Sequence, residues 1–244
     1  MPPLPLEAGE QCIVRLIGGI MGCLSVFGGL FIVLAFLADP TKLRQGARGS
    51  AMLSPERKVL ALRDGYLRLL LWLSIADVIN SASWALNLGA QGDRQLCLAQ
   101  GVLMQYGDIC SALWSACMGY ELYRFVVCLD QDVCGNFSRK RHKVYHVVSW
   151  GLPAILACVP LWTSSYGDAG DWCWVREEYT AVRFLINYAP VFITLVVNIV
   201  CYGITARHLH LKLRRSFTKL TAYPVVRMWC VCVCMGLGWT WVMG

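Results

Sequence analysis

Two acidic residues stand in the middle of long apolar stretches, where a charged side chain needs a partner. Asp77 lies 11 residues after Tyr66, and Asp108 lies 11 residues after Cys97. If both stretches are membrane helices, a rise of about 1.5 Å per residue places each carboxyl group about 16 Å deep, where a charge costs about 2.5–3.5 kcal/mol. We interpret Asp77 as part of a polar or ion-binding switch and Asp108 as a ligand or polar-network residue. The alternative for both is a protonated or hydrogen-bonded structural acid.

A second pair of charged residues lies further along the stretch that contains Asp108. Glu121 and Arg124 are three residues apart, so they share one face of a helix near its inner end and can form an ion pair. Such a pair can latch the end of a helix. The alternative is that Arg124 extends its side chain to the membrane interface beside an unrelated acid.

Three of the 13 cysteines fall at the face that we expect to be external, namely Cys12, Cys97 and Cys173. Oxidation is possible there, and a bridge between Cys97 and Cys173 would hold the loop around Cys173 over the helices. The flanking Trp172 and Trp174 are expected to be interfacial anchors, with ligand contact as the alternative. Most other cysteines lie in apolar stretches, where a thiol behaves as a small hydrophobic group.

We recognise no catalytic motif in this sequence. The histidines do not lie near a Ser or Cys nucleophile in a known arrangement, and no phosphate-binding glycine signature occurs. His208 and His210 are two residues apart and face different sides of a helix, which is a poor zinc arrangement. The net charge of +7 is accounted for by basic loops. We therefore expect no enzyme, no cofactor, no metal and no nucleic-acid partner.

The elements that position these residues are predicted to be membrane helices. The chain is 57% hydrophobic and 15% charged, whereas soluble domains are about 25% charged. Its apolar residues gather in stretches of about 20 residues, long enough to cross a bilayer. We predict an all-α, polytopic membrane helix bundle with a single membrane domain over residues 1–244. The six predicted spans are 13–37, 66–90, 97–129, 144–162, 179–206 and 224–243.

Loops and prolines add local expectations. The longest loop is predicted over 38–65, with Pro55 among its structure-breaking residues, and a short second loop makes the second and third spans antiparallel neighbours. Pro153, Pro160 and Pro190 lie inside predicted spans, where other helices can satisfy the backbone carbonyls that they leave without a donor.

The distribution of basic residues predicts the orientation. Of the 22 Lys and Arg residues, 18 fall on the side of loops one, three and five, and 4 on the other side. Cytoplasmic loops are enriched in these residues, so the amino terminus is predicted to be extracellular, with the protein in the plasma membrane in contact with lipid. The only Asn-x-Ser/Thr site, at Asn136, then lies in the cytosol and is expected to carry no glycan.

Several segments together resemble a known receptor family. They are LSIADVI from Leu73, CLAQGVLMQYGDICSALW from Cys97, LYRFVV from Leu122, GDWCWV from Gly170 and NYAPVFITLVVN from Asn187 to Asn198. From about the second span to the start of the sixth, the chain resembles the cyclic-AMP-receptor-like (class E) G-protein-coupled receptors, which include slime-mould cyclic AMP receptors and plant relatives. The joint occurrence of these motifs is more specific than seven-helix hydropathy.

The resemblance implies a seven-helix architecture and roles for individual residues. It implies that Asp77 is a switch residue and that Cys97 and Cys173 are bridged. It also implies that Arg124, with Glu121 beside it, helps to engage a heterotrimeric G protein. Asp108 matches no family acid. The matching fifth span adds Asn198 to the polar network and Asn187 and Tyr188 to the ligand-facing candidates, which also include Asp108, Trp172 and Trp174.

The predicted function is that of a cell-surface receptor that transduces an external ligand signal to a G protein. Cyclic AMP is only one possible ligand, because no basic residue is placed at membrane depth to hold a phosphate. After AYPVVRMW, from Ala222 to Trp229, the sequence departs from the family pattern and ends without a seventh span, so truncation is expected. A truncated, non-signalling protein that associates with full-length receptors as an oligomer is the first alternative. A transporter is the second, although no corresponding half-repeats are visible.

Overall fold

The computed structural model describes residues 8–38, 55–87, 89–90, 92–128 and 136–216, which are almost entirely helical. The helices, in chain order with the π-helical segments η2 and η4 and the 3-10 segment η3, are α1 (Ala8–Ala38), α3 (Pro55–Leu86), α4 (Arg94–Val126), α5 (Asn136–His146), η2 (Val147–Gly151), α6 (Leu152–Trp162), η3 (Glu177–Tyr179), α7 (Thr180–Arg183), η4 (Phe184–Tyr188) and α8 (Ala189–Ser216). Two short strands, β1 (Tyr166–Asp168) and β2 (Cys173–Val175), follow α6.

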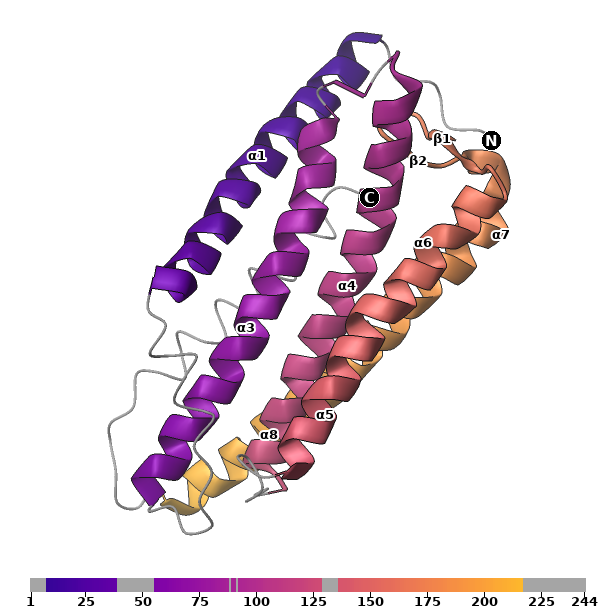
Figure 1. Ribbon diagram of the computed structural model, residues 1–244. Helices are drawn as coiled ribbons and strands as arrows, with labels where there is room; N and C mark the ends of the chain where they lie inside the picture. Colours follow the sequence, from indigo (N-terminus) through magenta and orange to yellow (C-terminus); the bar gives the residue numbers. More distant parts are fainter. Residues whose placement is uncertain (1–7, 39–54, 88, 91, 129–135, 217–244) are drawn as a thin grey trace. The chain divides into compact units, whose positions relative to one another are not determined.

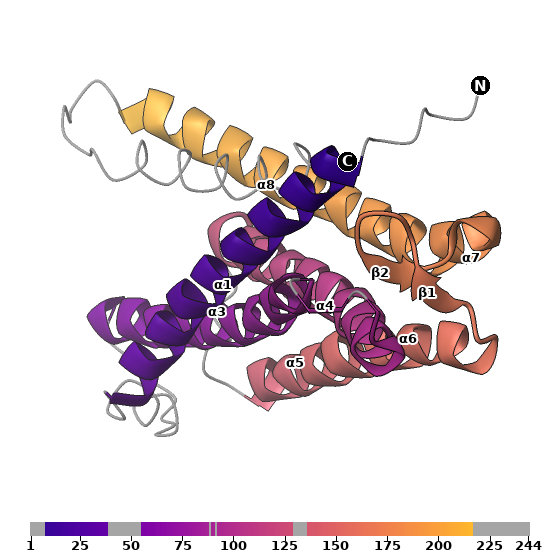
Figure 2. The ribbon, with the colours of Figure 1, turned by 90° about the horizontal axis from the view of Figure 1, so that it is seen from above.

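Met1–Thr205 forms one compact unit and Ala206–Gly244 a second, and the packing below concerns the first. Within it, α1 packs on α3, and α3 packs on α4, its antiparallel neighbour, as predicted (Figure 1). Helix α4 also contacts α6, η2, η4 and both strands, so it lies centrally among these elements (Figure 2). This central position explains why α4 buries polar side chains such as Gln100 and Gln105, both 0% exposed.

Four described segments are long and apolar enough to cross a membrane: Ile13–Ala38, Gly65–Leu86, Lys140–Trp162 and Glu177–Lys212. They present large apolar side chains outward; Phe27 and Phe31 of α1 are 71% and 74% exposed, as expected of a lipid-facing surface. Helix α4 is not among the four. The all-α membrane bundle is confirmed. The count of six spans is not, and the predicted span 224–243 lies outside the described residues.

The predicted first loop is too long. Helix α3 begins at Pro55, about ten residues before the predicted start of the second span at 66. Proline has no N–H to donate and a backbone angle suited to a helix, so it is favoured at the first position of a helix rather than being only a breaker. The predicted spans 144–162 and 179–206 lie within longer helical segments that begin at Asn136 and extend to Ser216. The apolar parts of these segments, Lys140–Trp162 and Glu177–Lys212, agree with the predicted spans to within six residues.

Both π-helical segments end two residues before a proline, η2 before Pro153 and η4 before Pro190. A proline cannot donate to the carbonyl four residues earlier, and each of these carbonyls falls within the π segment. For Pro190 the affected carbonyl is that of Ile186, which accepts a hydrogen bond from Gln105 Nε2 at 2.9 Å. The prediction that another helix satisfies a proline-freed carbonyl is therefore confirmed at Pro190.

Two glycines permit the close approach of the helices. A Cβ atom at Gly107 of α4 would lie 2.7 Å from Asn80 Cα and 2.8 Å from Asn80 N of α3. A Cβ atom at Gly22 of α1 would lie 2.7 Å from the backbone nitrogen of Ala85. Since backbone atoms cannot rotate out of the way, any side chain at these positions must push the helices apart.

An aromatic cluster fills the space between α3, α4 and the α5–η2 segment. Trp114 of α4 is 0% exposed, and its ring centroid lies 6.2 Å from that of Trp72 and 5.7 Å from that of Trp150. The imidazole of His146 meets Trp114 edge-on at 5.0 Å. Aromatic rings bury large areas and pack in defined geometries, so this cluster fixes the positions of the three helical segments relative to one another.

Candidate functional site

A disulfide joins the start of α4 to the β-hairpin. Cys97 and Cys173 are bonded with an S–S distance of 2.07 Å and a Cα–Cα distance of 5.1 Å, which confirms the predicted bridge. The strands pair antiparallel, with Asp168 opposite Cys173, and Gly170 in the connecting turn has a φ of 103°, which glycine adopts without strain. This end of the bundle, with the disulfide and the strands, is called the hairpin end below.

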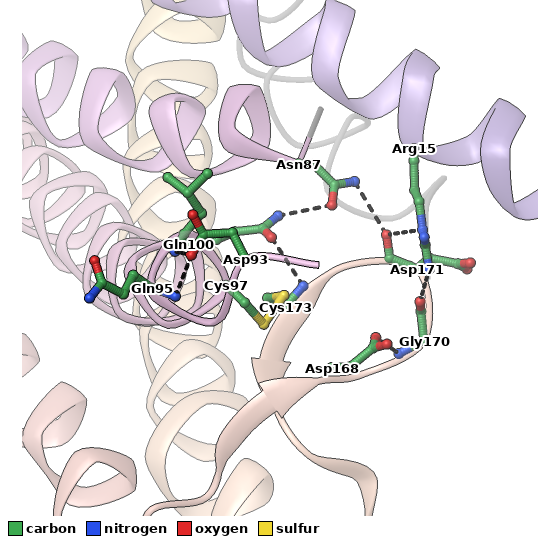
Figure 3. The surroundings of a disulfide bond; sticks show 11 residues. Arg15, Asn87, Asp93, Gln95, Cys97, Gln100, Asp168, Gly170, Asp171 and Cys173 are labelled. Atoms are coloured by element: carbon green, nitrogen blue, oxygen red, sulfur yellow. Dashed lines mark hydrogen bonds between the residues drawn. A yellow bond between two sulfur atoms is a disulfide. The ribbon is translucent and has the colours of Figure 1, made fainter. Parts of the chain in front are cut away.

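Buried amides hold the hairpin against α3 and α4 (Figure 3). The backbone N–H of Cys173 donates to Gln100 Oε1 at 3.1 Å, and Gln100 Nε2 donates to Asn87 Oδ1 at 3.1 Å. Asn87 Nδ2 in turn donates to the carbonyl of Asp171 at 3.3 Å. The oxygen and the nitrogen of both amides, Gln100 and Asn87, thus have partners, which is what a stable buried network requires.

Further contacts fix the two sides of the hairpin. Arg15 of α1 donates from Nε to the Asp171 carbonyl at 3.1 Å, and it also donates to the carbonyl of Gly170 (Figure 3). On the other side, the Tyr166 hydroxyl donates to the carbonyl of Ala157 at 3.1 Å. Burial raises the pKa of Tyr166, so it stays a protonated donor. The hairpin is therefore tied to α1, α4 and α6.

A cavity of about 470 Å³ opens at the hairpin end, within the range of small-molecule sites. It lies beside the disulfide, between α1, the start of α4 and the hairpin. The lining includes guanidinium groups, carboxylates and the ring of Trp172. The charged lining residues are Arg15, Arg94, Asp93, Asp168 and Asp171. Such a lining suits a small polar ligand that carries charged groups of either sign.

Of the three predicted ligand-facing aromatic residues, one lines this cavity, one is buried and one is half exposed. Trp172 lines the cavity and packs on Trp84 with ring centroids 5.5 Å apart. Trp174 is 5% exposed, and its Nε1–H donates to Gln105 Oε1 at 2.9 Å. Tyr188 meets the Trp174 ring edge-on at 5.9 Å, with 52% of its own surface exposed.

Three polar contacts follow one face of α4 toward the opposite end. Asn187 Nδ2 donates to Asp108 Oδ2 at 3.5 Å, and the Ser111 hydroxyl donates to Asp77 Oδ1. Asn198 Nδ2 donates to the Ser115 hydroxyl at 3.3 Å. Positions 108, 111 and 115 recur at helical spacing, so α4 contributes to all three contacts from the same face. These three contacts, which place Asp77, Asp108 and Asn198 along α4, are called the polar track below.

At the end opposite the hairpin, Glu121 joins α4 to α5. Its Oε1 accepts from Arg141 Nε at 3.2 Å and from the Tyr145 hydroxyl at 2.7 Å. Glu121 therefore forms its ion pair with Arg141 of the next helix. The sequence suggests a different partner, Arg124 on the same helix. Arg124 extends over the ring of Tyr120, 5.9 Å from its centroid.

Sequence reasoning missed the buried glutamines and the hairpin. Attention to ionisable groups at membrane depth found Asp77 and Asp108 but not Gln100 and Gln105, although any polar side chain within an apolar span needs a partner. Three-residue strands leave too short an alternation to be recognised. In the part of the chain that the structure describes, no group of three or more His, Cys, Asp or Glu residues is arranged to hold a metal ion.

A bundle of apolar helices with a disulfide-anchored hairpin at one end defines a multi-pass α-helical membrane protein. The model of the slime mold cyclic AMP receptor family matches residues 62–223, more than half of the chain. The chain belongs to this family, whose members are receptors rather than enzymes. The matched range agrees with the predicted extent of the resemblance.

Individual relatives come from distant organisms. Cyclic AMP receptor 4 of Dictyostelium discoideum is 25% identical over 224 residues, covering 84% of this chain and 45% of the relative. G-protein coupled receptor 1 of Arabidopsis thaliana is 26% identical, covering 79% of this chain and 52% of the relative. G-protein coupled receptor 157 of Homo sapiens is 26% identical, covering 66% and 49%. The chain thus spans about half the length of these relatives.

Proposed function

We propose that this chain forms the membrane core of a cell-surface receptor that binds a small external ligand at the hairpin end and signals to a heterotrimeric G protein from the opposite end. The observation that carries the proposal is the cavity of about 470 Å³ beside the Cys97–Cys173 disulfide. A hairpin fixed to three helices can convert the binding of a ligand into helix movement.

The orientation in the plasma membrane follows from two independent features. A disulfide forms on the oxidising side of the membrane, which favours an extracellular hairpin end. The basic residues of the predicted loops one, three and five favour a cytosolic opposite end. The amino terminus, which precedes α1, is then extracellular.

In this proposal the polar track forms the switch and the opposite end forms the partner surface. Each contact of the polar track joins α4 to a neighbouring segment by one hydrogen bond, at Asp77, Asp108 or Asn198. A small shift of one helix therefore breaks such a bond and frees its groups for other partners. Glu121 and Arg124 lie where a G protein would bind, and the Glu121–Arg141 ion pair restrains α4 against α5. Asn187, Tyr188 and Trp174 respond to the ligand through the hairpin, whereas Trp172 touches it.

Ligand binding and nucleotide exchange test the two halves separately. Cyclic AMP, named in the first relative, is the first probe for binding to the purified chain in lipid nanodiscs, followed by a panel of amines and amino acids. Asp171→Asn and Arg94→Gln are expected to weaken binding of the probe that binds about ten-fold or more each, since each removes one charged contact. Glu178→Gln is the matched control, because Glu178 pairs with Arg176 outside this cavity.

Exchange of a fluorescent GTP analogue on a co-reconstituted G protein tests the second half. Arg124→Ala is expected to reduce ligand-stimulated exchange while ligand binding persists. Wild-type exchange with Arg124→Ala would refute the role of this residue. Specific binding without exchange by the unaltered chain would refute signalling and favour a receptor-associated interaction protein.

A further inference from the structure

The side chain of Gln105 makes two hydrogen bonds to two different parts of the protein. Its carboxamide is 0% exposed, accepts from Trp174 Nε1 of β2 at 2.9 Å and donates to the carbonyl of Ile186 in η4 at 2.9 Å. One planar amide therefore joins the hairpin to the π-helical segment that leads into α8. The hairpin also meets this region directly, through the Trp174–Tyr188 ring contact and the hydrogen bond from Arg183 Nε to the Val175 carbonyl at 2.8 Å.

The second bond is needed because of a proline. Pro190 has no N–H, so in an α-helical pattern the Ile186 carbonyl would have no donor four residues on. In a dehydrated bundle a carbonyl without a donor is strongly disfavoured, and Gln105 supplies the missing N–H. The neighbouring Asn187 donates to Asp108, three residues beyond Gln105 on the same face of α4, so η4 is held at two successive positions.

Gln105 can make both hydrogen bonds at the same time only when Trp174 and Ile186 keep the positions that they have in this structure. The oxygen and nitrogen of a carboxamide are fixed on opposite sides of one carbon, so rotation that follows a displaced Trp174 withdraws the N–H from Ile186. Trp174 is packed tightly, with Arg183 over its ring at 5.1 Å, so a shift of β2 is passed on to it. Loss of both bonds then removes the side-chain donor of the Ile186 carbonyl and favours a different bend before Pro190.

We propose that Gln105 is a positioning residue that couples the disulfide-anchored hairpin to the proline bulge at the start of α8. Movement of the hairpin changes the conformation of η4 and α8 through this amide. The use of the coupling by a ligand rests on the proposed receptor function. The coupling itself needs neither ligand nor G protein, so its test can fail independently of that function.

Hydrogen exchange measured by mass spectrometry on the whole chain in lipid nanodiscs tests the coupling. Trp174→Phe keeps an aromatic six-membered ring but removes the indole N–H donor, and it is expected to raise exchange in peptides covering 184–194 about ten-fold through more frequent opening. Trp172→Phe, the same change on the same hairpin, packs on Trp84 instead of Gln105 and is expected to leave these peptides unchanged.

A double-mutant cycle identifies Gln105 as the connection. Gln105→Met keeps the length of the side chain without its polar atoms, and is expected to raise exchange over 184–194 at least as much as Trp174→Phe. Adding Trp174→Phe to Gln105→Met is expected to cause no further increase. Additive effects, or an effect of Trp174→Phe confined to peptides covering 166–176, would overturn the proposal.

A second experiment does not depend on the folding of the Gln105→Met variant. Pro190→Ala provides a backbone N–H that can bond the Ile186 carbonyl in place of Gln105. In this background Trp174→Phe is expected to change exchange over 184–194 less than two-fold. The same ten-fold increase with and without Pro190 would show that the bulge responds to the hairpin by another route.

Discussion

Replacement of Gly107 by alanine tests the close packing of α3 against α4. The new Cβ atom would lie 2.7 Å from Asn80 Cα and 2.8 Å from Asn80 N, both backbone atoms that cannot turn aside. Overpacking of this kind costs about 1–3 kcal/mol. Replacement of glycine by alanine within a helix also returns up to about 1 kcal/mol of intrinsic helix stability, so a control that shares this gain is needed.

Gly203→Ala is that control. Gly203 lies within α8, and no atom is within 4 Å of the position that its Cβ would take. The gain in helix propensity is common to both variants, so the difference between them isolates the overpacking cost of about 1–3 kcal/mol. In a chain of this size, each kcal/mol of destabilisation lowers Tm by about 2–4 °C. The overpacking cost therefore corresponds to a difference in Tm of about 2–12 °C between the two variants.

A thiol-reactive fluorescent dye provides the assay. After exposed thiols such as Cys128 and Cys158 have been blocked on the folded protein with a non-fluorescent reagent, Cys110, which is 0% exposed and lies on α4 close to Gly107, reacts when the bundle opens on heating. In lipid nanodiscs, Gly107→Ala is expected to show the lower Tm and Gly203→Ala a Tm equal to or above that of the unaltered chain. Equal Tm values for the two variants would refute the inferred α3–α4 contact, and a higher value for Gly107→Ala would do so more strongly.

Three further predictions concern other parts of the chain. Cys173→Ser is expected to destabilise the protein by up to about 4.5 kcal/mol, since the disulfide to Cys97 closes a loop of 76 residues, and a matching fall in Tm under non-reducing conditions checks this; no fall would contradict it. Asp77→Asn, which keeps the shape but weakens the charge-assisted bond from Ser111, is expected to change the ligand dose-response more than the surface expression measured in parallel, and identical dose-response curves would argue against a switch. Asn136 is expected to be free of glycan, so digestion with a glycosidase should leave the electrophoretic mobility unchanged; a shift would place this segment in the secretory lumen and reverse the predicted orientation.

The sequence was sufficient for the class of fold and for several residues of the candidate site. Long apolar stretches predicted membrane helices. In lipid, backbone N–H and C=O groups must hydrogen-bond to one another, and few structures other than helices allow this. The external positions and the family motifs of Cys97 and Cys173 led to the disulfide that the structure shows. The depth of Asp77 and Asp108 predicted that each needs a partner, and the structure supplies Ser111 and Asn187.

The start of one helix and the partner of one acidic residue were predicted less well, each for a local reason. The start of α3 at Pro55 was missed because proline is both a helix breaker and a favoured first helical residue. The spacing of Glu121 and Arg124 suggested a pair on one helix, but Arg141 of α5 lies beside Glu121 in the folded chain. Spacing along one helix gives no information on residues that a neighbouring helix brings close.

The sequence by itself determined that the chain enters a membrane, since hydropathy depends on composition within one segment at a time. It also determined that Pro190 frees a carbonyl, because the missing N–H is a covalent property of the residue. Only the tertiary structure decided that Gln105 satisfies that carbonyl, 81 positions away in sequence, and that the same amide holds Trp174. Such pairings depend on which helix faces are buried together, and they are settled only when the helices and the hairpin pack around α4.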